Sequence, residues 1–294
     1  MSKKIFLPIR SWSTFGEKQL KVKLGVPKIK IIFENQFVVV IDKPAGIMSH
    51  SDGRKEEYTL ADWLKDFVEQ KFSKKTWQSI LKNVGEEGRE GIVHRLDTGT
   101  TGVMILALNL DSFNFLKKQF HNHNLKKIYQ AIIVGHLKDT TGIIDAPIAR
   151  SKSDFRKKNV KDIFEKDGQG NISGPERSAV TRYKVLARLK SKSGQPFTLV
   201  ECYPETGRTH QIRVHFRSIR HPILGDELYG VKFTEKENLE KDFSIKIVRP
   251  MLHATSLQIK ILENNLETDK IYSVDKIFSA HIPNDMKKVL AELK

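Results

Sequence analysis

The chain has 294 residues, of which 39% are hydrophobic and 29% charged, so it is long enough to bury a sizeable core as one large domain or two small ones. Its 51 Lys and Arg against 35 Asp and Glu give a net charge of +16, which predicts a polyanionic partner, either nucleic acid or an anionic membrane surface. The absence of any apolar run of about 18 residues argues against a membrane, and a single cysteine, Cys202, excludes an intrachain disulfide framework. With no signal-peptide pattern at its start, the protein is expected in the cytoplasm.

The first third of the chain predicts strands, a turn and a helix. Residues 1–28 form a basic extension, either an edge strand or an arm that touches RNA. Apolar runs at 31–33 and 37–41 predict two strands around a turn. The spacing of apolar residues predicts a helix over 60–72, with Thr59 as N-cap and Asp62 completing a capping box. A short helix is expected over 76–82.

Residues 91–108 are the most informative stretch. Asp97 lies between the pair His94-Arg95 and a turn rich in Gly and Thr, which leads into an apolar strand at 103–108. Such a turn can hold one carboxylate in a fixed place at the end of a rigid element. Two interpretations stay open at this point: a catalytic carboxylate, or an ordinary turn in which Asp97 caps local amides.

The middle of the chain alternates between helix and strand. Asp111 or Ser112 is expected to cap a helix that turns Phe115, Leu116 and Phe120 inward. Strands are expected over 128–134, which carries Tyr129, and over 143–148. Residues 151–178 are rich in Lys, Asp, Gly and Ser and predict a mobile loop insertion, either solvated or in contact with phosphate.

The last third predicts a hairpin, a basic helix and further strands. Strands are expected over 180–186, 197–203, 252–262 and 271–278, and a final helix from Pro283. Thr209 is expected to cap a helix running to residue 220, with Ile212, Phe216 and Ile219 buried. Arg213, Arg217 and Arg220 would then form a row on an adjacent face, either solvated or, as the high positive charge favours, in contact with phosphate or carboxylate. Strands dominate with single helices between them, which predicts an α+β fold with a mainly antiparallel sheet.

The residue pattern disfavours several chemistries. The ten histidines show no H-E-x-x-H spacing, and no G-x-S-x-G elbow is present. Asp97-Thr98-Gly99 matches the aspartic protease signature, but those enzymes need two carboxylates and only one copy occurs here. One acid among basic residues suits an enzyme that acts on a glycosidic bond in nucleic acid, with no cofactor and no metal.

Three blocks of the sequence resemble the RluA-type family of RNA pseudouridine synthases. The matching motifs are Asp42-Lys43-Pro44-Ala45-Gly46; Val93-His94-Arg95-Leu96-Asp97 with Lys127-Ile128-Tyr129; and Gly207-Arg208-Thr209-His210-Gln211-Ile212-Arg213, followed by Leu224-Gly225-Asp226 and Tyr229-Gly230. The resemblance implies a mixed, mainly antiparallel central sheet with flanking helices and a basic active-site cleft, within a catalytic domain over 29–294.

The same resemblance implies the chemistry and its residues. Asp97 would be the catalytic carboxylate, Tyr129 would stack on the target uracil, and Arg213 would pair with Asp97 and keep it charged. Residues expected to bind RNA are Arg95, His94, Lys43, Arg208, His210, Arg217 and Arg220. The enzyme would act without a cofactor as a cytoplasmic monomer on ribosomal or transfer RNA, with the target uridine flipped into the cleft.

The sequence departs from the family pattern at three places. Thr98-Gly99 replaces the usual residues between the Asp and the Thr pair, the 151–178 insertion is long, and residues 1–28 are too short for the RNA-binding domain of many members. The alternative function is a catalytically inactive RNA-binding or RNA-folding protein on the same scaffold.

Overall fold

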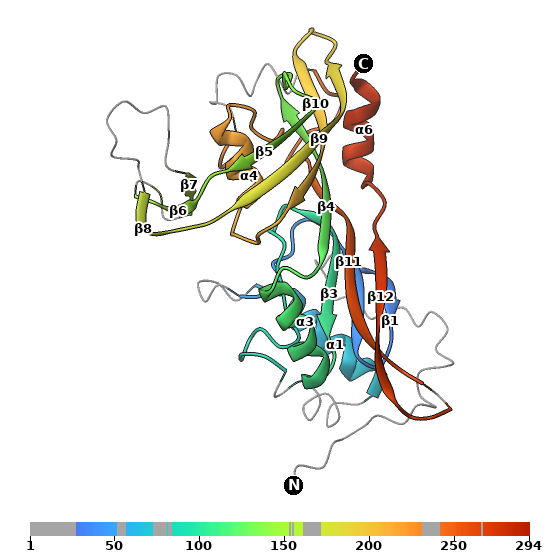
Figure 1. The fold of residues 1–294 in the computed structure, drawn as a ribbon. Helices are drawn as coiled ribbons and strands as arrows, with labels where there is room; N and C mark the ends of the chain where they lie inside the picture. Colours follow the sequence, from blue (N-terminus) through green and yellow to red (C-terminus); the bar gives the residue numbers. More distant parts are fainter. Residues whose placement is uncertain are drawn as a thin grey trace. The chain divides into compact units, whose positions relative to one another are not determined.

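The computed structural model describes residues 28–51, 57–72, 81, 84–152, 154, 156–160, 172–230, 242–265 and 267–294 (Figure 1). Residues 1–27 of the expected extension and nearly all of the helix expected at 76–82 lie outside these residues. The chain divides into two compact units: Met1–Leu125 with Ser256–Ala280, and Lys126–Thr255 with His281–Lys294. We call these the first and second units. The single domain expected over 29–294 stays a prediction.

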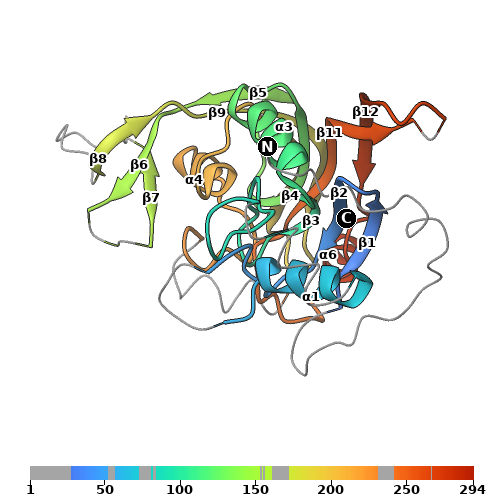
Figure 2. The same ribbon diagram turned by 90° about the horizontal axis from the view of Figure 1, so that it is seen from below.

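The first unit is an antiparallel sheet with two helices. Its strands are β1 (Lys30–Glu34), β2 (Val38–Lys43), β3 (Thr101–Ala107), the part of β11 (Leu252–Asn264) from Ser256 onward, and β12 (Ile271–Ser279), in the order β1-β2-β3-β11-β12. All residues of β3 are buried, as its apolar run predicts. Figure 2 shows α1 (Leu60–Phe72) beside β1 and α3 (Leu110–His121) beside β3.

The helices of the first unit test the capping predictions. Thr59 and Asp62 form the expected capping box, since the Thr59 amide donates to the Asp62 carboxylate (3.0 Å) and the Asp62 amide to Thr59 Oγ1 (3.4 Å). The prediction for α3 was wrong, because Asn109 is its N-cap and Ser112 completes the box. The helix buries Leu116 as expected, together with Phe113, Ser112 and Gln119, but leaves Phe115 and Phe120 half-buried.

The second unit has a larger and a smaller sheet. The larger follows the order β11-β4-β10-β9-β5, with β4 (Lys126–Val134), β5 (Thr141–Asp145), β9 (Val180–Lys190) and β10 (Pro196–Pro204). The smaller follows the order β7-β6-β8, with β6 (Ile148–Ser151), β7 (Lys158–Val160) and β8 (Ile172–Arg177). Figure 2 shows α4 (Gln211–Ser218) beside the smaller sheet. The pairings confirm a mostly antiparallel α+β fold.

Three predictions for the second unit need correction. The expected strand at 143–148 is two strands, because Pro147 cannot donate a ladder hydrogen bond and the chain changes sheets there. The expected loop at 151–178 contains β7 and β8. The N-cap of helix α4 is His210, in a left-handed conformation (φ 59°), and not the expected Thr209. The helix ends at Ser218, so Arg220 (φ 65°) lies beyond it.

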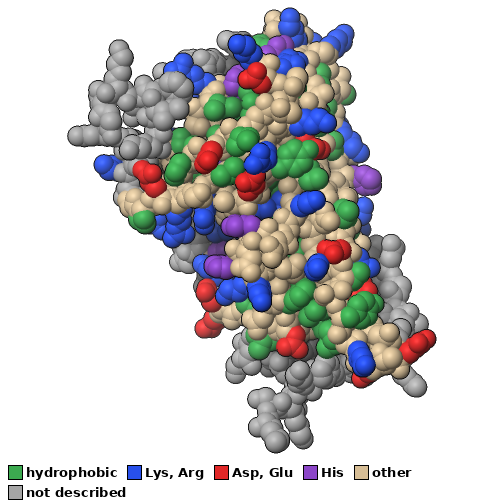
Figure 3. All heavy atoms as spheres, viewed as in Figure 1, with side chains coloured by type: hydrophobic (Ala, Val, Ile, Leu, Met, Phe, Trp, Pro, Cys, Tyr) green, Lys and Arg blue, Asp and Glu red, His purple; other side chains and the backbone are tan. Residues whose placement is uncertain are grey.

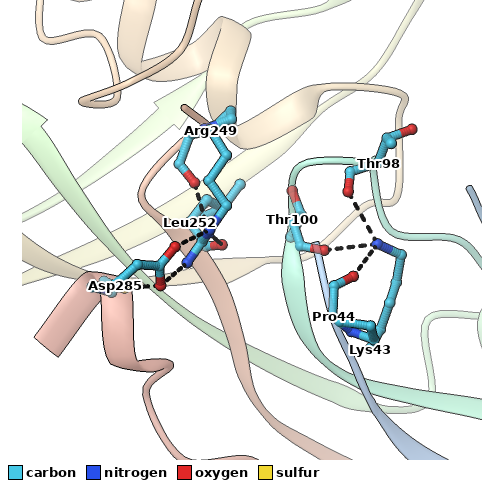
Figure 4. A network of polar contacts seen from close by, with 9 residues as sticks. Lys43, Pro44, Thr98, Thr100, Arg249, Leu252 and Asp285 are labelled. Carbon is cyan, nitrogen blue, oxygen red and sulfur yellow. Dashed lines mark hydrogen bonds and ion pairs between the residues drawn. The ribbon is translucent and has the colours of Figure 1, made fainter. Parts of the chain in front are cut away.

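Among the described residues, two of the apolar clusters of the second unit join its strands to its helices, and an ion pair adds to them. One cluster joins β4, β10 and α4, and it contains Cys202, whose thiol pKa is raised by burial. The other joins Phe197 to Met286 of α6 (Asn284–Glu292). Arg249 then fixes α6 by donating to both oxygens of Asp285 (2.6 and 2.8 Å; Figure 4).

Candidate active site

The turn that carries Asp97 is built around the buried ammonium group of Lys43. Lys43 is fully buried at the end of β2, and its Nζ donates to the backbone carbonyls of Pro44 (3.0 Å), Thr98 (3.3 Å) and Thr100 (3.0 Å; Figure 4). The Asp97 carbonyl lies 3.2 Å from the same Nζ, so four carbonyls share its three N–H donors. A buried charge needs such hydrogen bonds to offset its lost hydration. Lys43 therefore holds the backbone of the turn, and its expected contact with RNA stays a prediction.

The segment after Lys43 holds the same turn from its other side. The Gly46 amide donates to the Thr98 carbonyl (2.9 Å). Ser49 Oγ donates to the Leu96 carbonyl (3.0 Å) and accepts from the Leu96 amide (3.3 Å). The backbone on both sides of Asp97 is thus fixed, while the Asp97 residue itself is only half-buried. A carboxylate presented in this way is suited to act on a bound substrate.

Arg95 is exposed and contacts a buried histidine. Its Nη1 donates to His50 Nε2 (3.4 Å), while His50 Nδ1 donates to the Ser51 carbonyl (2.8 Å). Both contacts require neutral His50 with its proton on Nδ1. Burial is the main cause that lowers the pKa of His50, and the Arg95 charge lowers it further. His50 was not singled out from the sequence, where nothing distinguishes it from the other histidines.

His94 has a structural role in the first unit. Its Nε2 accepts a hydrogen bond from the Ile105 amide of β3 (3.1 Å), and its ring stacks on Phe120 of α3 with centroids 4.4 Å apart. The ring thereby joins the strand after Asp97 to a helix. Contact between His94 and RNA stays a prediction, although two of its surfaces are used within the protein.

Arg213, the second expected catalytic residue, forms a buried ion pair in the second unit. Its Nε and Nη2 donate to the two carboxylate oxygens of Asp226 (2.7 and 2.9 Å), and the Asp226 side chain is fully buried. The Arg213 guanidinium also lies over the Tyr229 ring, 5.1 Å from its centroid. Arg213 therefore does not share a solvent-facing row with Arg217, which is exposed. A bidentate contact fixes the plane of the guanidinium.

The Leu224-Gly225-Asp226 loop supplies this partner through close backbone packing. Gly225 has φ of 77°, and a Cβ there would lie 2.2 Å from the Arg249 carbonyl oxygen. Only glycine permits both this conformation and this approach. Asp226 then accepts from the amides of Leu228 and Tyr229 (3.0 and 3.1 Å). The sequence indicated a tight loop here, but not that it holds Arg213.

The loop before α4 is held by Gln211 and Lys127. Gln211 Oε1 accepts from Thr206 Oγ1 (2.7 Å) and from the Arg208 amide (3.0 Å). Arg208 Nε donates to the Ser178 carbonyl (3.0 Å), and Lys127 Nζ to the Thr206 carbonyl (2.9 Å). Lys127 lies two residues before Tyr129 on β4, so it links that strand to the loop that leads into α4.

Lys127 predicts a measurable pH dependence of stability, because burial lowers its pKa from 10.5 to about 8. Between these values the unfolded chain binds more protons than the native state, so raising the pH favours the native state. The stability of the wild type relative to a Lys127→Met variant should therefore increase from pH 8 to pH 10.5, by up to about 3 kcal/mol. Denaturant unfolding of both proteins across this range measures it, and a constant difference would contradict the assignment.

The expected site residues fall in both units. Lys43, His94, Arg95 and Asp97 belong to the first unit, and Tyr129, Arg208, His210, Arg213, Arg217 and Arg220 to the second. Within the second unit the structure brings His210 and Arg213 together around Tyr229, whose hydroxyl lies 2.9 Å from His210 Nδ1. The convergence of Asp97, Tyr129 and Arg213 stays a prediction. Among the described residues, no group of three or more His, Cys, Asp and Glu side chains is placed to hold a metal ion.

Comparison with known proteins identifies the family of this chain. The family model for RNA pseudouridylate synthase matches residues 37–218, which include Lys43, Asp97, Tyr129 and Arg213. The chain belongs to the RNA pseudouridylate synthase family. It is therefore an RNA pseudouridine synthase, an isomerase whose substrate is RNA. No helix in the described part of the chain is long and apolar enough to cross a membrane.

Individual relatives of this pseudouridine synthase cover most of its length. It is 33% identical to ribosomal large subunit pseudouridine synthase D of Borreliella burgdorferi, over 91% of this chain and 73% of that protein. It is 33% identical to the protein of the same name from Zymomonas mobilis, over 88% of this chain and 71% of that protein. The solved structure of human RNA pseudouridylate synthase domain containing 4 has a TM-score of 0.63 at 25% identity, over 90% of this chain and 94% of that one.

Proposed function

We propose that this synthase isomerises uridines of large-subunit ribosomal RNA, with Asp97 as the catalytic carboxylate and without a cofactor. The observation that carries the substrate is the similarity to large-subunit synthases over nine-tenths of the chain. The choice of Asp97 as the catalytic residue is supported by the turn that presents it. The backbone of this turn is bound to Lys43 on one side and to the 46–49 segment on the other.

The reaction needs no external reagent. The bond between uracil N1 and the sugar C1′ breaks, the base turns, and a bond forms between C5 and C1′. The C5 proton then leaves and N1 gains one, so substrate and product are isomers. Asp97 acts either as a nucleophile at C1′ or as a base that removes a sugar proton. The target uridine has to leave its stack to reach this carboxylate.

Tyr129 and Arg213 complete the proposed site. Tyr129 would stack on the detached uracil and assist loss of the C5 proton. Arg213 would pair with Asp97 and keep it ionised. The buried Asp226 supports this role because it sets the orientation of the guanidinium before RNA binds. Arg95, His210, Arg208, Arg217 and Arg220 would contact RNA around the target, and the protein would act as a monomer.

The function is tested by pseudouridine mapping. Purified protein incubated with large-subunit ribosomal RNA lacking the modification should produce pseudouridine at defined positions, and cells without the gene should lack it at the same positions. Transfer RNA is the comparison substrate. Product on transfer RNA alone would overturn the ribosomal assignment, and no product on any cellular RNA would overturn Asp97-dependent catalysis.

A further inference from the structure

The smaller sheet of the second unit carries three cations on one face. Arg150 on β6 lies directly opposite Lys158 on β7, and Arg177 on β8 lies opposite Ile148 of β6. Residues opposite each other on paired strands share a face, and so do residues two apart on one strand. Arg150, Lys158, Arg177 and Ile148 therefore share one face, and the three cations are called the basic triad below.

This face is the one that packs against α4. Ile148 and Val160 form an apolar cluster with Val214 of α4 and with Tyr229. The Lys158 amide donates to the Tyr229 hydroxyl (2.7 Å), which also contacts His210. Through these contacts the basic triad is attached to the part of the second unit that carries His210 and Arg213.

The triad has no acidic partner among the described residues. Neither Arg150, Lys158 nor Arg177 takes part in any ion pair there, and the nearby Asp154 is bound to Arg156 (2.8 Å). Burial lowers the pKa of Lys158, and the charges of Arg150 and Arg177 lower it further, in agreement with the shared face that the strand register gives. Like charges placed opposite each other on a sheet destabilise it. An anion bound across the triad would remove that cost.

We propose that Arg150, Lys158 and Arg177 form a phosphate-binding surface for the backbone of the substrate RNA. The choice of RNA as the ligand rests on the proposed function. The location of the surface rests on the strand register and on the lack of acidic partners for these three side chains among the described residues. Figure 3 shows Lys and Arg side chains gathered beside β6 and β8. RNA phosphate is the preferred occupant because the enzyme's substrate is RNA and Arg binds phosphate in a bidentate manner.

The test is a triple variant, Arg150→Gln, Lys158→Gln and Arg177→Gln, compared with a control of equal charge loss. The control replaces three exposed lysines with Gln: Lys270, Lys287 and Lys288. These lysines lie far along the chain from the triad. The probe is a fragment of large-subunit ribosomal RNA. The triad variant should weaken binding about 10- to 100-fold, and lower the slope of log K against log salt by about 2, while the control changes both much less.

Further measurements separate the outcomes. At saturating RNA the triad variant should keep kcat within about twofold of the wild type, because the loss is in binding. A variant with Arg150→Lys and Arg177→Lys keeps the charge and should retain most of the affinity for RNA.

Two results would overturn the proposal: wild-type affinity and salt slope in a folded triad variant, or an equal loss of affinity in the control. Loss of binding to vesicles of anionic lipid, with RNA affinity unchanged, would assign the surface to membranes instead. A wild type that binds RNA through the triad but makes no pseudouridine would refute only the proposed function.

Discussion

Replacing Asp97 with Asn is expected to reduce pseudouridine formation by about 10⁴-fold or more, because the amide can neither attack the sugar nor accept its proton. Folding should be nearly unaffected. The Lys43 contacts to this turn use backbone carbonyls, and Asn has the same shape as Asp. Single-turnover assays on ribosomal RNA measure the loss, and RNA affinity should change by less than about threefold.

Glu87→Gln is the matched control for Asp97→Asn, since Glu87 is exposed in the same unit and its replacement also removes one negative charge. It should retain wild-type activity. Pseudouridine formation by Asp97→Asn at more than a few per cent of the wild-type rate would show that another group performs the chemistry. It would leave the family assignment intact and redirect the search for the reacting carboxylate.

Replacing Lys43 with Met should lower both stability and activity. The variant leaves four backbone carbonyls without the fully buried ammonium that bridges them. Two of them keep another bond, since the Asp97 and Thr98 carbonyls accept from the amides of Thr100 and Gly46. We therefore expect a loss of about 2–4 kcal/mol in the free energy of unfolding. Displacement of the turn should reduce kcat by about 10²-fold.

Thermal unfolding and steady-state kinetics check the Lys43 prediction. Lys30→Met provides the control, because Lys30 is an exposed lysine on the adjacent strand of the same unit. A Lys43→Met protein that unfolds at the wild-type temperature would show that the carbonyls find other partners. A variant that binds RNA less tightly but keeps kcat would support the predicted contact between Lys43 and RNA.

The local patterns of the sequence predicted most elements of the fold. Strand β3 could be found because a run of apolar residues is buried on both faces, and α1 because its apolar stripe follows a capping box. Strands β7 and β8 could not, since they are short and polar and depend on pairing with β6. The N-cap of α3 was missed because Asn109 and Asp111 carry equivalent cap signals two positions apart.

Motif similarity nominates candidate residues of the site, but the sequence does not show the distant partners that decide what a side chain contacts. The sequence identified Asp97, Tyr129 and Arg213 through motif similarity. It did not show that Lys43 binds carbonyls 54 to 57 positions away, or that Arg213 pairs with Asp226. The sequence does not distinguish the roles of individual basic residues in a strongly basic protein. Burial distinguishes Lys43, which binds backbone carbonyls, from the exposed basic residues that can bind phosphate.

The burial of Cys202 gives the protein a useful property for labelling. It is the one cysteine of the chain, it is fully buried in β10, and its raised thiol pKa keeps it from forming the reactive thiolate. A cysteine introduced at the exposed Ser178, directly after β8, would then be the only reactive thiol. A fluorophore attached there would report the arrival of RNA at the smaller sheet in real time, without removal of any native residue from the core.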